Sequence, residues 1–431
     1  MKKVYSRKWM YIGMILLYLA ISDVFGLIDL NVWISSGGEG YDIVFILMLA
    51  GSIRSTWPHI RIPTFKKAGK IGIANCLLFS YIVVSGIVLV VSGGQGVFQT
   101  ISVMREVFYI LIFYSFWQGK YETDEMLKLI IELELMAELV YFIEFFTGPL
   151  TSMHIHGTLG ISGNWRFYTA TPLFVNFICP LLVYRHYEKK TLFSQKKDII
   201  LLFLLLGFQV IKQGRTALVA TLLIVLFSVM DASGRNKRKV INALFLIPTV
   251  IIICAFIGNT FFPAYWRRLI EVTEAIINIG NHSYDSTLSV RTGTIQVRYE
   301  YLLNCGKLLF GLGPLHNEAT ISVSLGASIY DRVNAGVLAI DTAYGSILIR
   351  YGIIGLFLYV FPYILCIISY IRKTDLLCKS MALYACGCLI GAMSSHAALC
   401  FYAPLKFGIL LGIIFKERNA ISESSNLWQK I

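Results

Sequence analysis

Charged residues are scarce in this chain of 431 residues. They make up 15% of it, whereas a soluble domain carries about 25%. Long apolar runs recur, for example at 71–91, 199–211 and 241–257, and about 20 apolar residues suffice for a helix to cross a bilayer. These runs do not alternate polar with apolar residues, which excludes a β-barrel. We therefore expect an all-α, polytopic transmembrane protein of about twelve spans, forming a single integral membrane domain.

Other signals are missing as well. The nine cysteines show no paired CxxC spacing, so buried structural thiols are expected and not a metal site. The apolar stretch 9–28 lacks a small-residue cleavage site and is expected to be a retained first span. The net charge of +13 does not indicate nucleic-acid binding, because most basic residues form short clusters between apolar spans, as in cytoplasmic loops.

The distribution of basic residues defines a topology. With the N-terminus in the cytoplasm, the inner loops hold 26 of the 38 lysines and arginines, as the positive-inside rule requires. Both termini are then expected on the cytoplasmic side of a bacterial inner membrane. The expected spans are 9–28, 41–54, 71–91, 98–117, 126–146, 168–184, 199–212, 216–231, 240–258, 345–371, 380–397 and 401–415.

One extracytoplasmic loop, residues 259–340 between spans nine and ten, is far longer than the others. A loop of this length in a compact protein is usually functional. Its stretches 266–279 and 291–309 show helical apolar spacing, which predicts two or three helices on or near the membrane surface. The next-longest outer loop, 147–167, contains two histidines and Arg166.

The two faces of the membrane differ in their positive charge. The cytoplasmic side holds 18 lysines and 8 arginines, whereas the outer side holds nine arginines and three lysines. Arginine is preferred where a planar fork must bind phosphate or carboxylate with two parallel hydrogen bonds. We therefore expect an anionic ligand, such as a lipid pyrophosphate, at the outer face; pairing with outer acids and lipid headgroups is the alternative. The nine arginines are Arg105, Arg166, Arg215, Arg267, Arg268, Arg291, Arg298, Arg332 and Arg350.

Three of these arginines stand out by position. Arg215 ends a connection too short to leave the membrane boundary, where a charge usually has a task or a partner; snorkelling to the headgroups is the simpler explanation. Arg291 and Arg298 are seven residues apart and share a helix face, which Lys307 is expected to extend. A solvated amphipathic face explains that spacing nearly as well as a ligand site does.

The fifth span carries four glutamates, which cannot face lipid because each ionised carboxylate there would cost roughly 2–3 kcal/mol or more. Packing against Arg105 is the favoured explanation. A proton or cation pathway is the other, and it would support a transporter. The four are Glu132, Glu134, Glu138 and Glu144.

Two residues are candidates for a catalytic base. Asp341 stands just outside the tenth span, where its carboxylate could deprotonate or orient an acceptor; capping of the next helix by residues 341–342 is a compatible alternative. His316, in the long loop, is the less favoured base. Within the tenth span, Gly352 and Gly355 allow a break or close packing. The seven histidines are too scattered to propose a metal site.

Three stretches carry a resemblance to a known family. They are QGRTA at 213–217, SVR at 289–291 followed by LLFGLG at 308–313, and IDTAY at 340–344 followed by YGIIGL at 351–356. Their order, with the long outer loop, resembles the O-antigen polymerase (Wzy) branch of the O-antigen ligase/polymerase superfamily, over about residues 195–365. The ligase branch usually has a His-Asn pair where this chain has Asp341-Thr342, which favours a polymerase.

The resemblance implies a metal-independent glycosyltransferase with no cofactor. Its substrates would be undecaprenyl-pyrophosphate-linked oligosaccharides at the outer face of the membrane, and its product O-antigen, capsule or exopolysaccharide. Arg215 and Arg291 are implied to lie near the lipid pyrophosphate, with Arg298 or Arg166 as further ligands. Asp341, or His316, would orient or deprotonate the acceptor. A chain-length regulator and a flippase are candidate partners.

Two alternatives remain open. One is a ligase-type transferase of lipid-linked glycans. The other is a transporter or flippase of lipid-linked oligosaccharides, which would explain the glutamates of the fifth span but not the long, arginine-biased outer loop.

Overall fold

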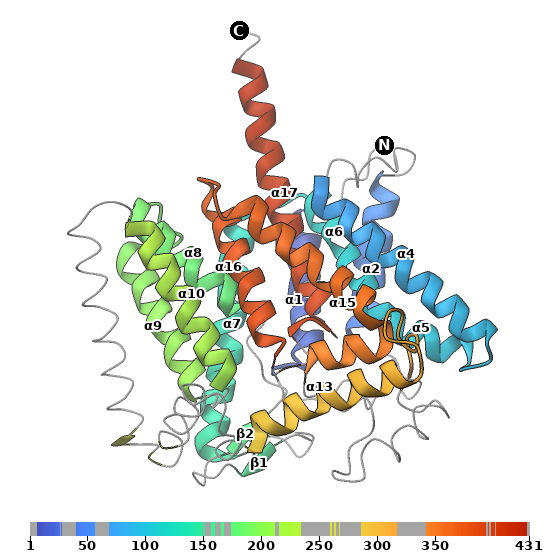
Figure 1. The fold of residues 1–431 in the computed structure, drawn as a ribbon. Helices are drawn as coiled ribbons and strands as arrows, with labels where there is room; N and C mark the ends of the chain where they lie inside the picture. The colour runs from blue at the N-terminus through green and yellow to red at the C-terminus, as the bar shows by residue number, and fades with distance from the viewer. Residues whose placement is uncertain are drawn as a thin grey trace. The chain divides into compact units, whose positions relative to one another are not determined.

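The structure is a computed structural model of the chain. Apart from turns and one small hairpin, the residues that it describes are helical (Figure 1). The chain divides into two compact units: unit 1 comprises Met1–Met48, Gly119–Ser286 and Ile371–Gly387, and unit 2 comprises Leu49–Gln118, Thr287–Tyr370 and Cys388–Ile431. The described residues are 7–25, 27, 40–56, 69–148, 150, 157–159, 165–167, 174–211, 215–233, 259–260, 263, 267, 286–316, 342–393, 395, 398–400 and 402–428.

Unit 1 is built on a group of apolar helices that pack against one another. Helix α8 contacts both α9 and α10, and α7 contacts α1 and α9. Short connections join α8 to α9 and α9 to α10, as expected for neighbouring helices. The bounds are α1 Arg7–Ile21, α7 Thr123–Thr147, α8 Val175–Glu188, α9 Gln195–Ile211 and α10 Arg215–Ser233, while α2 Gly40–Thr56 and α16 Leu376–Gly391 cross the boundary between the units.

A short β-hairpin also belongs to unit 1 and was not expected from the sequence. Strand β1 (Gly157–Leu159) pairs antiparallel with β2 (Trp165–Phe167), with Thr158 opposite Arg166. The β-branched and aromatic residues of these two segments favour strands. The hairpin places Arg166 on its second strand, within the outer loop predicted at 147–167.

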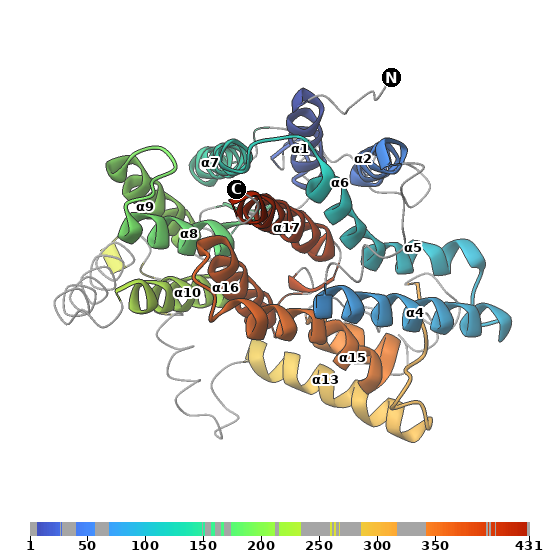
Figure 2. The same cartoon turned by 90° about the horizontal axis from the view of Figure 1, so that it is seen from above.

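Unit 2 contains the longest apolar helices. Helix α15 contacts α4, and Figure 2 shows α15 lying between α4 and α13. Helix α17 contacts α6 and the 3₁₀ turn η2. The bounds are α4 Gly69–Val91, α5 Val97–Phe108, η2 Tyr109–Ile112, α6 Phe113–Gln118, α13 Ser286–Asn304, α15 Ala343–Tyr370 and α17 Ala403–Trp428.

Apolar helices long enough to cross a membrane are present. Among the described residues three qualify by length and composition: Gly69–Val91, Val97–Gln118 and Ala343–Tyr370. Shorter apolar helices lie at Lys8–Ile21, Asp42–Gly51, Ala217–Ala232 and Leu376–Gly391. The ninth predicted span, 240–258, lies outside the described residues.

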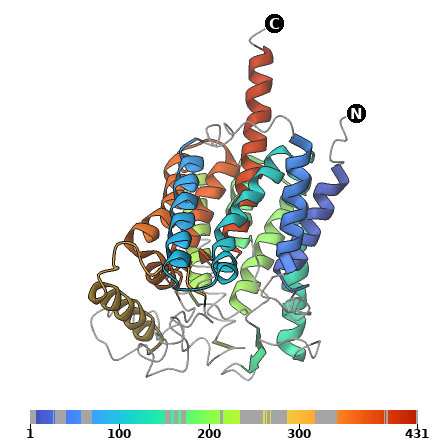
Figure 3. The ribbon, with the colours of Figure 1, turned by 90° about the vertical axis from the view of Figure 1, so that its right-hand side faces the viewer.

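Several boundaries differ from the expected ones, for example at α1, α8 and α16, and three further differences have a structural context. The span predicted at 98–117 is interrupted by η2, because α17 approaches its backbone closely: a Cβ on Gly408 would lie 2.6 Å from the Ile110 carbonyl oxygen. Helix α17 continues past residue 415 to Trp428 (Figure 3), through polar residues that tolerate helix. The helix expected over 291–309 is α13, which begins at Ser286 and ends at Asn304, two residues before Gly306 with its φ of +67°.

Candidate functional site

The candidate site lies in unit 2, around a break in helix α15. At Gly352 the backbone leaves the helical region, with φ 65° and ψ −166°. This confirms the break that Gly352 was expected to allow. A break in an apolar helix exposes backbone carbonyl and amide groups, and in a membrane each of these must find another partner.

Residues 307–316, here called the docking loop, supply those partners. The amides of Leu312 and Gly313 donate to the carbonyls of Ile349 and Arg350, at 3.1 and 2.7 Å. Beyond the break, the amide of Ile353 donates to the Leu308 carbonyl at 3.0 Å, and that of residue 354 to the residue 309 carbonyl at 3.1 Å. The loop therefore holds both halves of α15 through their main chains.

Tyr81 of α4 completes this arrangement. Its hydroxyl lies 2.7 Å from the carbonyl oxygen of Tyr351 and 3.1 Å from that of Phe310, so one side chain touches both the break and the docking loop. With one proton to donate, the hydroxyl bonds one of these carbonyls at a time. The last exposed carbonyl before the break thus has a donor within reach.

Two glycines permit the close approach of loop and helix. A Cβ on Gly311 would lie 2.5 Å from the Arg350 carbonyl oxygen and the same distance from the Gly352 amide nitrogen. A Cβ on Gly352 would overlap the Leu309 carbonyl. Both glycines also have positive φ, 71° and 65°, which other residues rarely adopt. Any side chain at either position would force the docking loop away from α15.

Arg298 of α13 points into the same region. Its side chain is 0% exposed, although it was predicted on a face that a solvated helix would also explain. A Cβ on Gly345 of α15 would lie 2.5 Å from Arg298 Nη1, so the absence of a side chain at Gly345 makes the room for the guanidinium. Lys307, expected on the same face, instead follows the end of α13 and is exposed. Arg298 is therefore an inward-facing arginine and not part of a basic surface stripe.

The start of α15 next to Arg298 is capped as expected. The Thr342 hydroxyl accepts a hydrogen bond from the Gly345 amide at 3.3 Å, which is an N-cap interaction. Asp341, the predicted base, lies outside the described residues. The structure thus places Arg298 beside the residue that follows Asp341 in the chain.

His316, the other predicted base, lies at the end of the docking loop and is half-buried. Gln95, between α4 and α5, holds this end: its Oε1 accepts from the His316 amide at 2.9 Å, and its Nε2 donates to the Pro314 carbonyl at 2.7 Å. The backbone of His316 is therefore anchored. On α13, burial together with a hydrogen bond to Cys305 raises the pKa of Tyr301 to about 12, so this phenol is no base at neutral pH.

Arg350, two residues before Gly352, was grouped with the outer arginines but given no role in the site. Its side chain is only 8% exposed, and its carbonyl is held by the docking loop. Tyr81 and Gln95 were not singled out either. A tyrosine on an apolar helix and a glutamine in a glycine-rich loop carry no spacing signal, because their partners in the docking loop are 219 or more residues away.

The other predicted arginines are placed by their backbones alone. Arg291 lies on α13 two turns before Arg298, in unit 2. Arg215 begins α10 and Arg166 lies on β2, both in unit 1. Of the six predicted site residues, Arg298, His316 and Arg291 thus fall in the unit that contains the break in α15.

The glutamates of α7 have partners within unit 1. Glu134 accepts a hydrogen bond from the Phe174 amide at 2.5 Å, Glu138 one from Gln209 at 3.4 Å, and Glu144 one from the Leu150 amide at 3.1 Å. All three are buried, whereas Glu132 is exposed. These hydrogen bonds offset part of the cost of burying the three carboxyl groups. The pairing with Arg105 stays a prediction.

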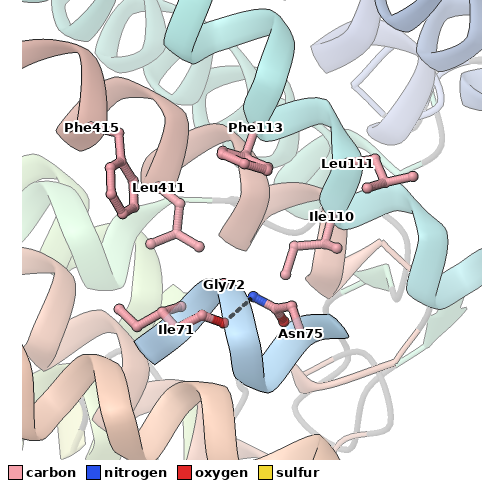
Figure 4. Close-up of a pocket in the computed structure, with 8 residues that line it drawn as sticks. All are labelled: Ile71, Gly72, Asn75, Ile110, Leu111, Phe113, Leu411 and Phe415. Atoms are coloured by element: carbon pink, nitrogen blue, oxygen red, sulfur yellow. Dashed lines mark hydrogen bonds between the residues drawn. The ribbon is translucent and has the colours of Figure 1, made fainter. Parts of the chain in front are cut away.

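Unit 2 also contains an apolar pocket at the start of α4 (Figure 4). The Asn75 amide nitrogen donates to the Ile71 carbonyl at 3.0 Å, and the rest of the wall is apolar. No titratable side chain lines it, so it is not a candidate for acid–base chemistry. Its lining residues are Ile71, Gly72, Asn75, Ile110, Leu111, Phe113, Leu411 and Phe415.

Neither a metal centre nor a relative points to another site. Within the described ranges, no three His, Cys, Asp or Glu side chains are grouped so as to hold a metal ion. Comparison of the chain with models of known protein families and with curated proteins gives no match. The functional argument therefore rests on the residues and their geometry.

Proposed function

We propose that this protein is a polysaccharide polymerase of the bacterial inner membrane. It would join undecaprenyl-pyrophosphate-linked repeat units at the outer face, to make O-antigen, capsule or exopolysaccharide. The single observation that carries this proposal is the meeting of two of the three resemblance stretches: the docking loop, with LLFGLG at 308–313, fits against the break in α15, with YGIIGL at 351–356. The two segments are about 40 residues apart in the chain, and their close contact requires Gly311 in one and Gly352 in the other.

Arg298 adds to this support. Its fully buried guanidinium lies beside Gly345, three residues after Thr342, which follows Asp341. A glycosyl transfer from a pyrophosphate requires a cation that stabilises the leaving group and a base that handles the acceptor proton.

The proposed topology has about twelve spans, with both termini in the cytoplasm and residues 259–340 outside. The apolar helices α4, α5–α6 and α15 are consistent with it. In this topology the docking loop, Arg298 and Arg350 all lie toward the outer face, where lipid-linked repeat units would be joined.

The proposed reaction has one bond-forming step. A hydroxyl oxygen of one lipid-linked repeat unit attacks the anomeric carbon of another chain, and the bond from that carbon to the pyrophosphate oxygen breaks. Undecaprenyl pyrophosphate leaves with the bonding electron pair. The hydroxyl proton passes to Asp341, or to His316. Arg215, Arg291, Arg298 and Arg166 are the proposed ligands of the developing negative charge.

A transporter or flippase is the second candidate, favoured by one observation. Glu134, Glu138 and Glu144 are buried along one helix, as in a proton or cation path. Each of them, however, accepts a hydrogen bond from a backbone amide or an amide side chain, which offsets part of the cost of its burial without a transported ion. A ligase-type transferase, the third, would need an acceptor other than a repeat unit.

Deleting the gene is expected to leave surface glycan with a single repeat unit, because ligation and flipping continue while chain growth stops. Gel electrophoresis of the glycans of the deletion strain, with and without the gene restored, measures this. Loss of all attached repeat units would instead indicate a flippase or a ligase.

A further inference from the structure

Arg350 is a buried cation for which the structure gives no counterion. Its side chain is 8% exposed, and its Nε is buried without a hydrogen-bond partner. Within the described part of the chain, no ion pair involves its guanidinium. By contrast, Arg185 at the end of α8 lies 2.6 Å from the Asp124 carboxylate.

Among the described residues, Glu106 of α5 is the acidic group that shares the surroundings of Arg350. Arg350 and Glu106 of α5 both act electrostatically on Tyr351 and Cys400, so the two charges share a neighbourhood without forming a pair. Tyr359 lies in the same group, with its ring centroid 5.6 Å from that of Tyr351 and the two rings tilted by 32°. A single acid at longer range offsets only part of the cost of burying an arginine in an apolar helix.

The backbone holds this arginine in place. Gly313 of the docking loop donates to the Arg350 carbonyl, and Tyr81 contacts the carbonyl of the next residue. A costly group that the surrounding structure fixes so firmly is expected to serve a ligand, because an apolar residue such as leucine would fit the helix at lower cost.

We infer that Arg350 binds a phosphate group. It would be a ligand-binding residue in addition to the four arginines and two candidate bases of the proposed site. The guanidinium is always charged and presents a planar fork that matches phosphate oxygens. The inference rests on the proposed function for its preferred ligand, the pyrophosphate of the lipid carrier. A phospholipid headgroup has the same chemistry and is the other possible source.

The test measures binding and stability, and it needs no polymer. Full-length protein is placed in nanodiscs of zwitterionic lipid, and the affinity for undecaprenyl pyrophosphate and for inorganic pyrophosphate is measured. Arg350→Met, which replaces the charged group by a shorter, unbranched apolar side chain, is expected to weaken pyrophosphate binding about 10- to 100-fold, as loss of a hydrogen-bonded charge does. Arg372→Met, at an exposed arginine after α15, is the control and is expected to bind as wild type does.

The melting temperature separates a ligand role from a structural one. If the role of Arg350 is to bind a ligand, Arg350→Met without ligand is expected to melt at or above the wild-type temperature, because the substitution removes an uncompensated buried charge. If Arg350 and Glu106 form a structural pair, Arg350→Met melts lower and adding Glu106→Gln restores stability; that outcome overturns the inference.

The arms also identify the source of the phosphate. Weaker binding of undecaprenyl pyrophosphate by Arg350→Met supports the lipid carrier as the source. A headgroup is supported instead if added anionic phosphatidylglycerol raises the melting temperature of the wild type but not that of Arg350→Met, while carrier binding is unchanged. Unchanged affinity for every phosphate compound refutes the inference, and a single-repeat glycan in the deletion strain would still uphold the proposed function. If Arg350→Met lost pyrophosphate binding but the deletion strain kept glycan of normal chain length, the inference about Arg350 would hold and the proposed function would be refuted.

Discussion

Gly311→Ala and Gly352→Ala are each expected to destabilise the protein by about 2–5 kcal/mol. The methyl group adds an unfavourable positive φ, at about 1–2 kcal/mol, to a steric overlap with the backbone that costs about 1–3 kcal/mol. At Gly311 the new Cβ would meet the Arg350 carbonyl at 2.5 Å, and backbone cannot move aside as a side chain can. Thermal unfolding of the purified variants in detergent measures the effect.

Gly306→Ala is the matched control for this pair. Gly306 also has a positive φ, +67°, but no atom would lie within 4 Å of its Cβ. The control therefore isolates the backbone strain, and its loss is expected to stay near 1–2 kcal/mol. Equal destabilisation at Gly306 and Gly311 would show that the docking loop does not fit against the break in α15.

Gly345→Ala is expected to leave the fold intact but to reduce polymer formation by about 10²-fold. Its Cβ would lie 2.5 Å from Arg298 Nη1 and 2.8 Å from the Thr342 hydroxyl, both at the ends of side chains that can move. Loss of the Thr342 cap costs about 0.5–2 kcal/mol, and the helix propensity of alanine returns about 1 kcal/mol. A guanidinium moved by about 1 Å is enough to lose this much rate.

Arg298→Lys tests the same site by replacing the guanidinium with an ammonium group, whereas Gly345→Ala moves the guanidinium. A lysine keeps the charge but not the planar fork, so a loss of about 10²–10³-fold in rate is expected. Arg372→Lys, at an exposed arginine after α15, is the matched control and is expected to behave as wild type. The length distribution of surface glycan in a complemented deletion strain reports both. Wild-type lengths from membrane-inserted Arg298→Lys would remove Arg298 from the site.

Much of the helical organisation could be predicted, because apolar runs and Lys/Arg clusters are local features. The run at 71–91 corresponds to α4, and Gly352 does break α15 where the helix was expected to be interruptible. The cap by Thr342 followed from its place before an apolar helix. These features depend on neighbours within one or two turns.

Features that depend on distant contacts could not be predicted in this way. The break in α15 is stable because residues 307–316 form hydrogen bonds with it. The sequence around Gly352 does not predict that these residues are its partners. The 3₁₀ turn η2 arises where Gly408 of α17 meets its backbone. The burial of Arg298 depends on the missing side chain of Gly345, so its spacing from Arg291 indicated a face but not its environment.

Reconstitution tests the proposed function most directly. Purified full-length protein in proteoliposomes is given only undecaprenyl-pyrophosphate-linked repeat units, and the lipid-linked products are separated by size. A polymerase is expected to produce a ladder that grows by one repeat unit, with one undecaprenyl pyrophosphate released for each bond formed. Repeat units that stay single, above all if they cross the bilayer unchanged, would contradict the proposal.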